Sequence, residues 1–98
     1  MGGGRPMTGV SSRYARVVTL VNADGLHARP AAEFVKLAGS SGGRVTVNGR
    51  DARSLLAILS LGLMQGAELE IATDDLDGRG AVDALADLVA TGFERTDR

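Results

Sequence analysis

The only histidine of the chain, His27, lies in the segment Gly25-Leu26-His27-Ala28-Arg29-Pro30. Proline is tolerated in the first turn of a helix, so Pro30 predicts that His27 lies at or beside a helix N-terminus. Free backbone N–H groups and the positive end of the helix dipole favour an anion there, and Arg29 adds a forked, charged donor. A neutral imidazole is also a competent nucleophile near pH 7. The position therefore favours phosphate chemistry over proton shuttling. A surface or capping role for His27 is the alternative, and spacing alone does not decide between them.

The composition excludes several other kinds of chemistry. The 98 residues include no cysteine, which excludes disulfides, thiol catalysis, iron–sulfur clusters and cysteine zinc sites. One histidine excludes multi-histidine metal sites as well. Eleven basic and twelve acidic residues give a net charge of −1, so bulk charge draws the chain neither to nucleic acid nor to anionic membranes. We expect no metal, no cofactor and no nucleic-acid partner.

Three weaker motifs do not support a site. The acidic run 74–78 has the look of a calcium loop, but Ala84 stands where an EF-hand needs a bidentate glutamate. The glycines at 39, 42 and 43 are not followed by the Lys-Ser/Thr pair of a P-loop. Arg50 and Arg53 make a small basic spot without interleaved aromatic residues.

Hydrophobic patterning predicts the elements that must position His27. Alternating residues predict strands over 15–21, 44–47, 50–53 and 68–73, and apolar residues at helical spacing predict helices over 30–37, from 55 to near Gly62, and over 81–90. Asn48-Gly49 is typical of a type I′ hairpin turn, and Ser54 is a plausible N-cap. The low aromatic content of 3% predicts an aliphatic core around Phe34. The order βαββαβα favours an α+β sandwich, in which one antiparallel or mixed sheet carries the helices on one face.

The length predicts a single domain, since halves of this chain would be too small to hold cores. Residues 1–13 are glycine-rich and without periodicity, so we expect a disordered leader, a folded domain over 14–94 and a flexible tail over 95–98. No apolar run reaches the ~18 residues of a membrane span, and the first residues lack the apolar stretch of a secretory signal. We expect a cytoplasmic monomer without membrane contact.

The segment around His27 resembles the active-site segment of HPr, the histidine-containing phosphocarrier family of the bacterial phosphoenolpyruvate-dependent sugar phosphotransferase system. The resemblance covers about residues 15–93, and the predicted βαββαβα order is the order of that family. It implies an open-faced sandwich of a four-stranded antiparallel sheet with three helices on one face. The motifs that carry it are Gly25–Ala32, Phe34-Val35-Lys36, Asn48-Gly49-Arg50, Ala52–Leu56, Leu61-Gly62 and Gln65-Gly66.

The resemblance also implies a role for each residue at the start of the segment. Enzyme I would phosphorylate His27 on Nδ1, and the phosphoryl group would then pass to a histidine of a sugar-specific enzyme IIA. Arg29 and the backbone amides of Ala28 and Arg29 would steady the phosphoryl group, whereas Pro30 has no N–H to offer. The protein would be a carrier with a covalent phosphohistidine intermediate rather than an enzyme.

The second predicted helix has more apolar positions than one buried stripe uses, so part of it should face outward. Leu55, Leu56 and Leu59 match the partner-binding positions of the family and are the expected docking surface. The alternative is a helix buried on both sides. Ser54 matches the family's regulatory serine, a target of an ATP-dependent HPr kinase/phosphorylase in some bacteria, although capping the helix is a sufficient reason for a serine there.

Three features depart from the usual family pattern. The hairpin between Gly43 and Ser54 is short, so its edge strand should be stunted. Asp24 puts a carboxylate near the expected phosphoryl group and should repel it. The run 91–94 resembles the nitrogen-related branch, NPr, which would pass phosphate to a regulatory enzyme IIA. A different class of function is a regulatory binding module that acts through phosphorylated Ser54.

Overall fold

The structure, a computed structural model, describes residues 13–23, 25–40 and 42–93. Four strands form one antiparallel sheet in the order β1-β4-β2-β3. The predicted α+β class and βαββαβα order are confirmed. The elements are β1 (Tyr14–Thr19), α1 (Ala28–Gly39), β2 (Val45–Val47), β3 (Arg50–Asp51), α2 (Leu55–Ser60), β4 (Glu68–Thr73), the short 3₁₀ helix η1 (Leu76–Gly78) and α3 (Arg79–Ala90).

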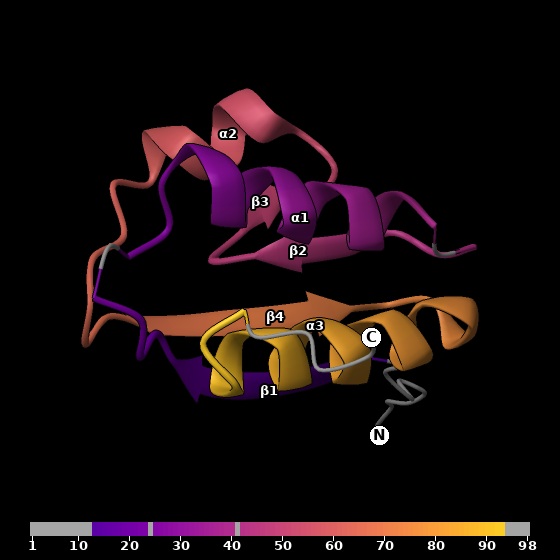
Figure 1. The fold of residues 1–98 in the computed structure, drawn as a ribbon. Coiled ribbons are helices and arrows are strands. Elements are labelled where there is room, and N and C mark those ends of the chain that lie inside the picture. The colour runs from indigo at the N-terminus through magenta and orange to yellow at the C-terminus, as the bar shows by residue number, and fades with distance from the viewer. Residues whose placement is uncertain (1–12, 24, 41, 94–98) are drawn as a thin grey trace, which may run out of the picture.

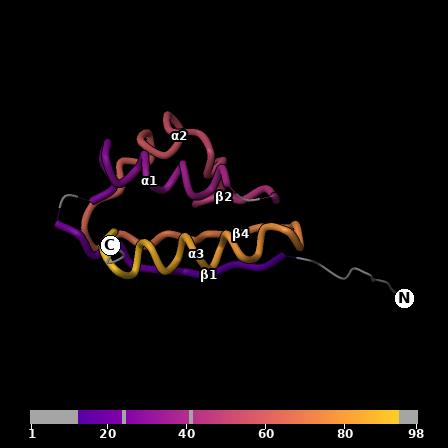
Figure 2. Tube along the Cα trace, turned by 45° about the vertical axis from the view of Figure 1, so that its right-hand side comes forward, coloured from indigo at the N-terminus to yellow at the C-terminus, as the bar shows by residue number. Residues whose placement is uncertain are grey.

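The three α-helices cover one face of the sheet. In Figure 1, α1 and α2 lie side by side over β2 and β3, and α3 runs along β1 and β4. The same pairing is visible in the turned view of Figure 2. Between the sheet and the helices lies an aliphatic core around Phe34, which is fully buried, with Tyr14 and Phe93 packed at its margin. The predicted core is thus confirmed.

Two helices begin two residues earlier than predicted. Helix α1 starts at Ala28 rather than at residue 30. Pro30 is its third residue, and the N–H that proline lacks would have no partner within the helix there, so the helix can begin before the proline. Helix α3 starts at Arg79 rather than at residue 81, because η1 leads directly into it. Apolar periodicity could not reveal either start, since the first residues of both helices are exposed.

The hairpin follows local rules. Asn48 and Gly49 have φ of 49° and 83°, as a type I′ turn requires, so the predicted turn is confirmed. The Asn48 side chain accepts a hydrogen bond from the Glu70 amide at 2.8 Å. Strand β3 spans two residues instead of the predicted four, because the Ser54 amide bonds to the Asp51 carbonyl and turns the chain into α2. The expected short edge strand is confirmed.

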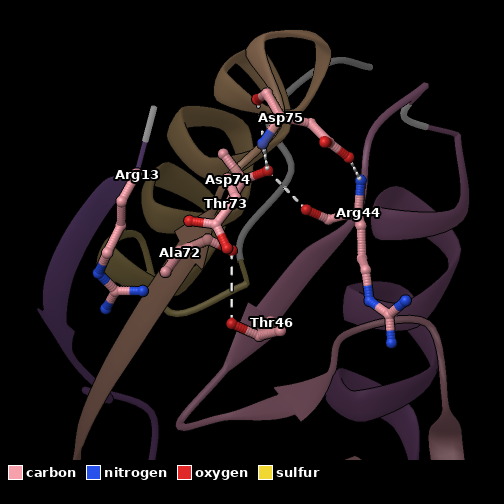
Figure 3. A pocket seen from close by; sticks show the side chains of 7 residues that line it. All are labelled: Arg13, Arg44, Thr46, Ala72, Thr73, Asp74 and Asp75. Atoms are coloured by element: carbon pink, nitrogen blue, oxygen red, sulfur yellow. Dashed lines mark hydrogen bonds between the residues drawn. The ribbon is translucent and has the colours of Figure 1, made fainter. Parts of the chain in front are cut away.

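At the other end of the sheet, the buried side chain of Thr73 joins the end of β4 to the start of β2 (Figure 3). Its hydroxyl donates to the Arg44 carbonyl at 2.5 Å and accepts from the Asp75 amide at 3.0 Å. The Asp75 carboxylate in turn accepts from the Arg44 amide at 2.9 Å. A hollow of about 130 Å³ lies beside this network and is lined by Arg13, Arg44, Thr46, Ala72, Thr73, Asp74 and Asp75. None of the residues predicted to bind phosphate or partners lines it.

The predicted leader over 1–13, apart from Arg13, and the predicted tail over 95–98 lie outside the described residues, as does Asp24. Within the described ranges, no helix is both long enough and apolar enough to span a bilayer.

Candidate functional site

His27 is the N-cap residue of α1, as the sequence predicted. Its backbone is extended, with φ −103° and ψ −163°, and its side chain makes no capping hydrogen bond. The His27 carbonyl accepts the first helical hydrogen bond, from the Ala31 amide at 2.8 Å. The N–H groups of Ala28 and Arg29 therefore precede the first helical donor, and Pro30 has none to offer. The exposed imidazole stands where the helix leaves backbone donors for an anion.

Arg29 is the second residue of α1 and is exposed. Among the described residues, its guanidinium forms no hydrogen bond and no ion pair. The side chain can therefore turn toward a group held at the helix N-terminus without first breaking an existing contact.

The chain reaches His27 through a buried and tightly held segment. Leu26 is 3% exposed and packs into the core, and its amide donates to the Leu63 carbonyl at 3.0 Å. Gly25 is buried in the left-handed region, with φ +66°. A Cβ at this position would lie 2.7 Å from the Leu63 oxygen and 2.8 Å from Met64 Cα. Only glycine combines this backbone angle with so close an approach.

Helix α2 presents an apolar surface beside α1. Ser54 caps it, accepting a hydrogen bond from the Ala57 amide at 3.2 Å, as predicted. Ile58 is fully buried, while Leu55, Leu56 and Leu59 are 41%, 79% and 37% exposed. The predicted outward-facing leucines are confirmed as exposed, and burial of the helix on both sides is wrong.

The sequence pattern did not single out Met64, which is 72% exposed and follows α2 in the turn that contacts Gly25. Because Met64 lies outside a helix, the helical repeat carries no signal for its exposure. Figures 1 and 2 both place α2 and the first turn of α1 at the same end of the molecule. Helix α1 packs beside α2, and the segment before His27 lies against the turn that carries Met64. We call Leu55, Leu56, Leu59 and Met64 the apolar patch.

A hydrogen-bonded pair of titratable side chains lies elsewhere, between β1 and α3. The Tyr14 hydroxyl donates to the Asp83 carboxylate at 2.6 Å, and Arg16 donates to the same oxygen at 3.2 Å. The hydrogen bond from Tyr14 is the main reason that the pKa of Asp83 is lowered, and the same bond raises the pKa of Tyr14. This cluster joins two elements of the fold and contains none of the predicted site residues.

The remaining motifs have structural roles. Asp75, in the acidic run, accepts from the Arg44 amide. The described part of the chain holds no group of three or more acidic or histidine side chains that could bind a metal ion. Arg53 lies 3.9 Å from the Asp51 carboxylate, in an exposed pair at the hairpin.

Comparisons with known proteins agree with this arrangement. Residues 14–91 match the family model described as the PTS HPr component phosphorylation site. The chain is 44% identical over 77 residues to phosphocarrier protein HPr of Streptomyces coelicolor, covering 74% of this chain and 83% of that protein. It is 38% identical over 82 residues to HPr of Haemophilus influenzae, covering 80% and 96%.

Solved structures agree as well. The crystal structure of HPr from Thermoanaerobacter tengcongensis matches with a TM-score of 0.77 and 33% identity, covering 84% of this chain and 98% of that one. HPr from Bacillus anthracis matches with a TM-score of 0.72 and 32% identity, covering 79% and 96%. The chain therefore belongs to the HPr family of phosphocarrier proteins of the phosphotransferase system.

Proposed function

We propose that His27 receives a phosphoryl group from enzyme I and passes it to a histidine of an enzyme IIA in sugar uptake. The observation that carries the proposal is the position of His27 as N-cap of α1, next to the N–H groups of Ala28 and Arg29. Family membership supports the carrier role, and the helix N-terminus supplies the donors that a phosphohistidine needs. The carrier domain, residues 14–94, would act as a monomer in the cytoplasm, because it must meet two partners in turn.

The transfer requires placement more than chemistry from the protein. The unprotonated ring nitrogen of neutral His27, Nδ1 by family resemblance, forms a bond to phosphorus as the P–N bond to the donor histidine breaks. The electron pair of the broken bond returns to the donor nitrogen, and the proton on the other His27 nitrogen stays in place. The transferred oxygens then carry charge beside the two amides, and the guanidinium of Arg29 neutralises part of it.

The apolar patch is the proposed docking surface for both partners. Leu56 exposes 79% of its surface, and Leu55 and Leu59 flank it on the same short helix. Burying a few such side chains suits a weak, transient contact, which a carrier must break after each transfer. If both partners presented polar faces to these leucines, the leucines would have no complementary surface, and this docking role would be wrong.

Ser54 is the proposed regulatory position. Its hydroxyl caps α2, directly before Leu55. A phosphate added there by an ATP-dependent HPr kinase/phosphorylase would put charge beside the apolar patch and weaken the docking of enzyme I. The alternative function as a regulatory module predicts instead that phosphorylated Ser54 creates binding to a new partner.

Incubation with phosphoenolpyruvate and the cognate enzyme I tests the proposal. We expect an acid-labile mass increase of one phosphate that is absent in His27→Ala and slowed in Arg29→Ala. Arg50→Ala, in which an exposed arginine is removed from the hairpin, is the matched control and should label normally. Uptake of acid-labile phosphate by His27→Ala would contradict the proposal.

Two further assays separate the alternatives. Transfer of label from the phosphorylated carrier to a sugar-specific enzyme IIA favours sugar uptake, whereas transfer only to a regulatory enzyme IIA favours the NPr branch. An acid-stable, ATP-dependent label that is lost in Ser54→Ala supports regulation at Ser54.

A further inference from the structure

Two hydrogen bonds join Asn22 to Gly25, which lies two residues before His27. The Gly25 amide donates to the Asn22 carbonyl at 3.1 Å. The Asn22 side-chain amide donates to the Gly25 carbonyl at 2.7 Å. The other side-chain atom, Oδ1, is buried and has no hydrogen-bond partner. The Asn22 side chain is thus fixed through its Nδ2 alone.

The acceptor of that bond belongs to a peptide unit that is held at both ends. The Gly25 carbonyl and the Leu26 amide lie in one rigid plane, since the peptide bond does not rotate freely. The carbonyl end accepts from Asn22, and the amide end donates to the Leu63 carbonyl at 3.0 Å. This plane is the last but one before His27, so its orientation sets the direction in which the chain enters the N-cap.

Gly25 packs against the backbone of Leu63 and Met64, but the adjoining residues give this plane few side-chain restraints. Gly25 has no side chain, and a glycine backbone rotates more freely than any other. Leu26 is anchored in the core on the far side of the plane. The bond from Asn22 is therefore the side-chain contact that fixes the Gly25 end.

We propose that Asn22 is a positioning residue for phosphoryl transfer, which holds the Gly25–Leu26 peptide plane and thereby the His27 imidazole in line for its partners. The inference rests on the function proposed above. It assigns to Asn22 no contact with the phosphoryl group. Its effect should appear in the rate of transfer, because a displacement of about 1 Å can cost up to ~100-fold in rate.

The variant Asn22→Leu tests this inference. Leucine nearly keeps the shape of asparagine and replaces the unpartnered Oδ1 with a methyl group, but it removes the donor to Gly25. Ser40→Ala is the matched control, because the Ser40 hydroxyl donates to the Leu37 carbonyl at the same distance of 2.7 Å, at the opposite end of α1. Both variants lose one side-chain bond to a backbone carbonyl, but only the first loses it next to His27.

Steady-state phosphorylation by enzyme I, with this carrier as the varied substrate, separates positioning from docking. For Asn22→Leu we expect kcat to fall about tenfold, with KM within twofold of the unchanged protein, and hydrogen exchange of the Leu26 amide to become faster. Ser40→Ala should keep both kinetic constants. If far-UV circular dichroism shows that Asn22→Leu does not fold, Asn22→Thr takes its place, with the same expected changes in kcat and KM.

An unchanged kcat, or a rise in KM alone, would overturn the inference and leave the proposed function standing. Failure of the unchanged protein to accept phosphate on His27 would overturn both.

Discussion

Replacement of Gly25 with alanine should destabilise the protein much more than the same change at Gly62. The two glycines have nearly the same left-handed angle, with φ of +66° and +62°. The backbone cost of alanine in this region, roughly 1 kcal/mol, is therefore common to both. The surroundings differ, because nothing lies within 4 Å of a Cβ at residue 62.

At residue 25 the added Cβ would lie 2.7 Å and 2.8 Å from backbone atoms of residues 63 and 64, which cannot turn away as a side chain does. Overpacking of this kind costs about 1–3 kcal/mol, and losing the hydrogen bond from Leu26 to Leu63 costs about 1 kcal/mol more. We therefore expect Gly25→Ala to lose about 2–4 kcal/mol more stability than Gly62→Ala. For a domain of this size the difference corresponds to roughly 10–30 °C in Tm.

Urea unfolding followed by far-UV circular dichroism measures this difference, since the chain has no tryptophan for fluorescence. Gly62→Ala should lower the midpoint slightly, and Gly25→Ala should lower it severely at an unchanged m-value. Equal midpoint shifts for the two variants would refute the reasoning, because they would mean that the contact of Gly25 with Leu63 carries no energy beyond the backbone angle.

Three further predictions concern other parts of the fold. Because the pKa of Asp83 is lowered in the folded state, its contribution to stability is present above the ordinary pKa of aspartate and is lost as the pH falls through the lowered value. Tyr14→Phe removes the hydrogen bond to Asp83, so it should raise the Asp83 midpoint in an NMR titration and make stability fall less steeply in acid. An unchanged midpoint would contradict this. Thr73→Val should cost about 2–3 kcal/mol in urea unfolding, because the Arg44 carbonyl loses its donor and the Asp75 amide loses its acceptor. A loss below ~1 kcal/mol would argue against the network. Leu56→Ser should change Tm by only a few degrees, because the side chain is 79% exposed. It should nevertheless raise the KM for this carrier in phosphorylation by enzyme I, and an unchanged KM would count against the apolar patch.

Features that follow from local rules could be predicted from the sequence. Asn48-Gly49 forms a type I′ turn because few other residue pairs accept two positive φ angles. Ser54 caps α2 because its hydroxyl reaches an amide three residues ahead. His27 lies at a helix start because a proline that lies within a helix, as Pro30 does, fits only in the first turn. The strand and helix periods predicted the order of the elements, since each kind of element repeats its side-chain directions with its own period.

Other features depend on residues distant in the sequence and left no local signal. The need for glycine at residue 25 comes from the backbone of Leu63 and Met64, which is distant in the sequence. The two-residue length of β3 comes from the turn into α2, which ends the strand before its alternating pattern does.

The amino-acid sequence by itself predicted that the single histidine lies at a helix start, because Pro30 follows it at a spacing that fits the first turn of a helix. Only the tertiary structure decided how that histidine is held. The peptide plane before Leu26 is fixed by Asn22 on one side and by Leu63 on the other, and two such contacts meet only when the loops after β1 and α2 pack against each other.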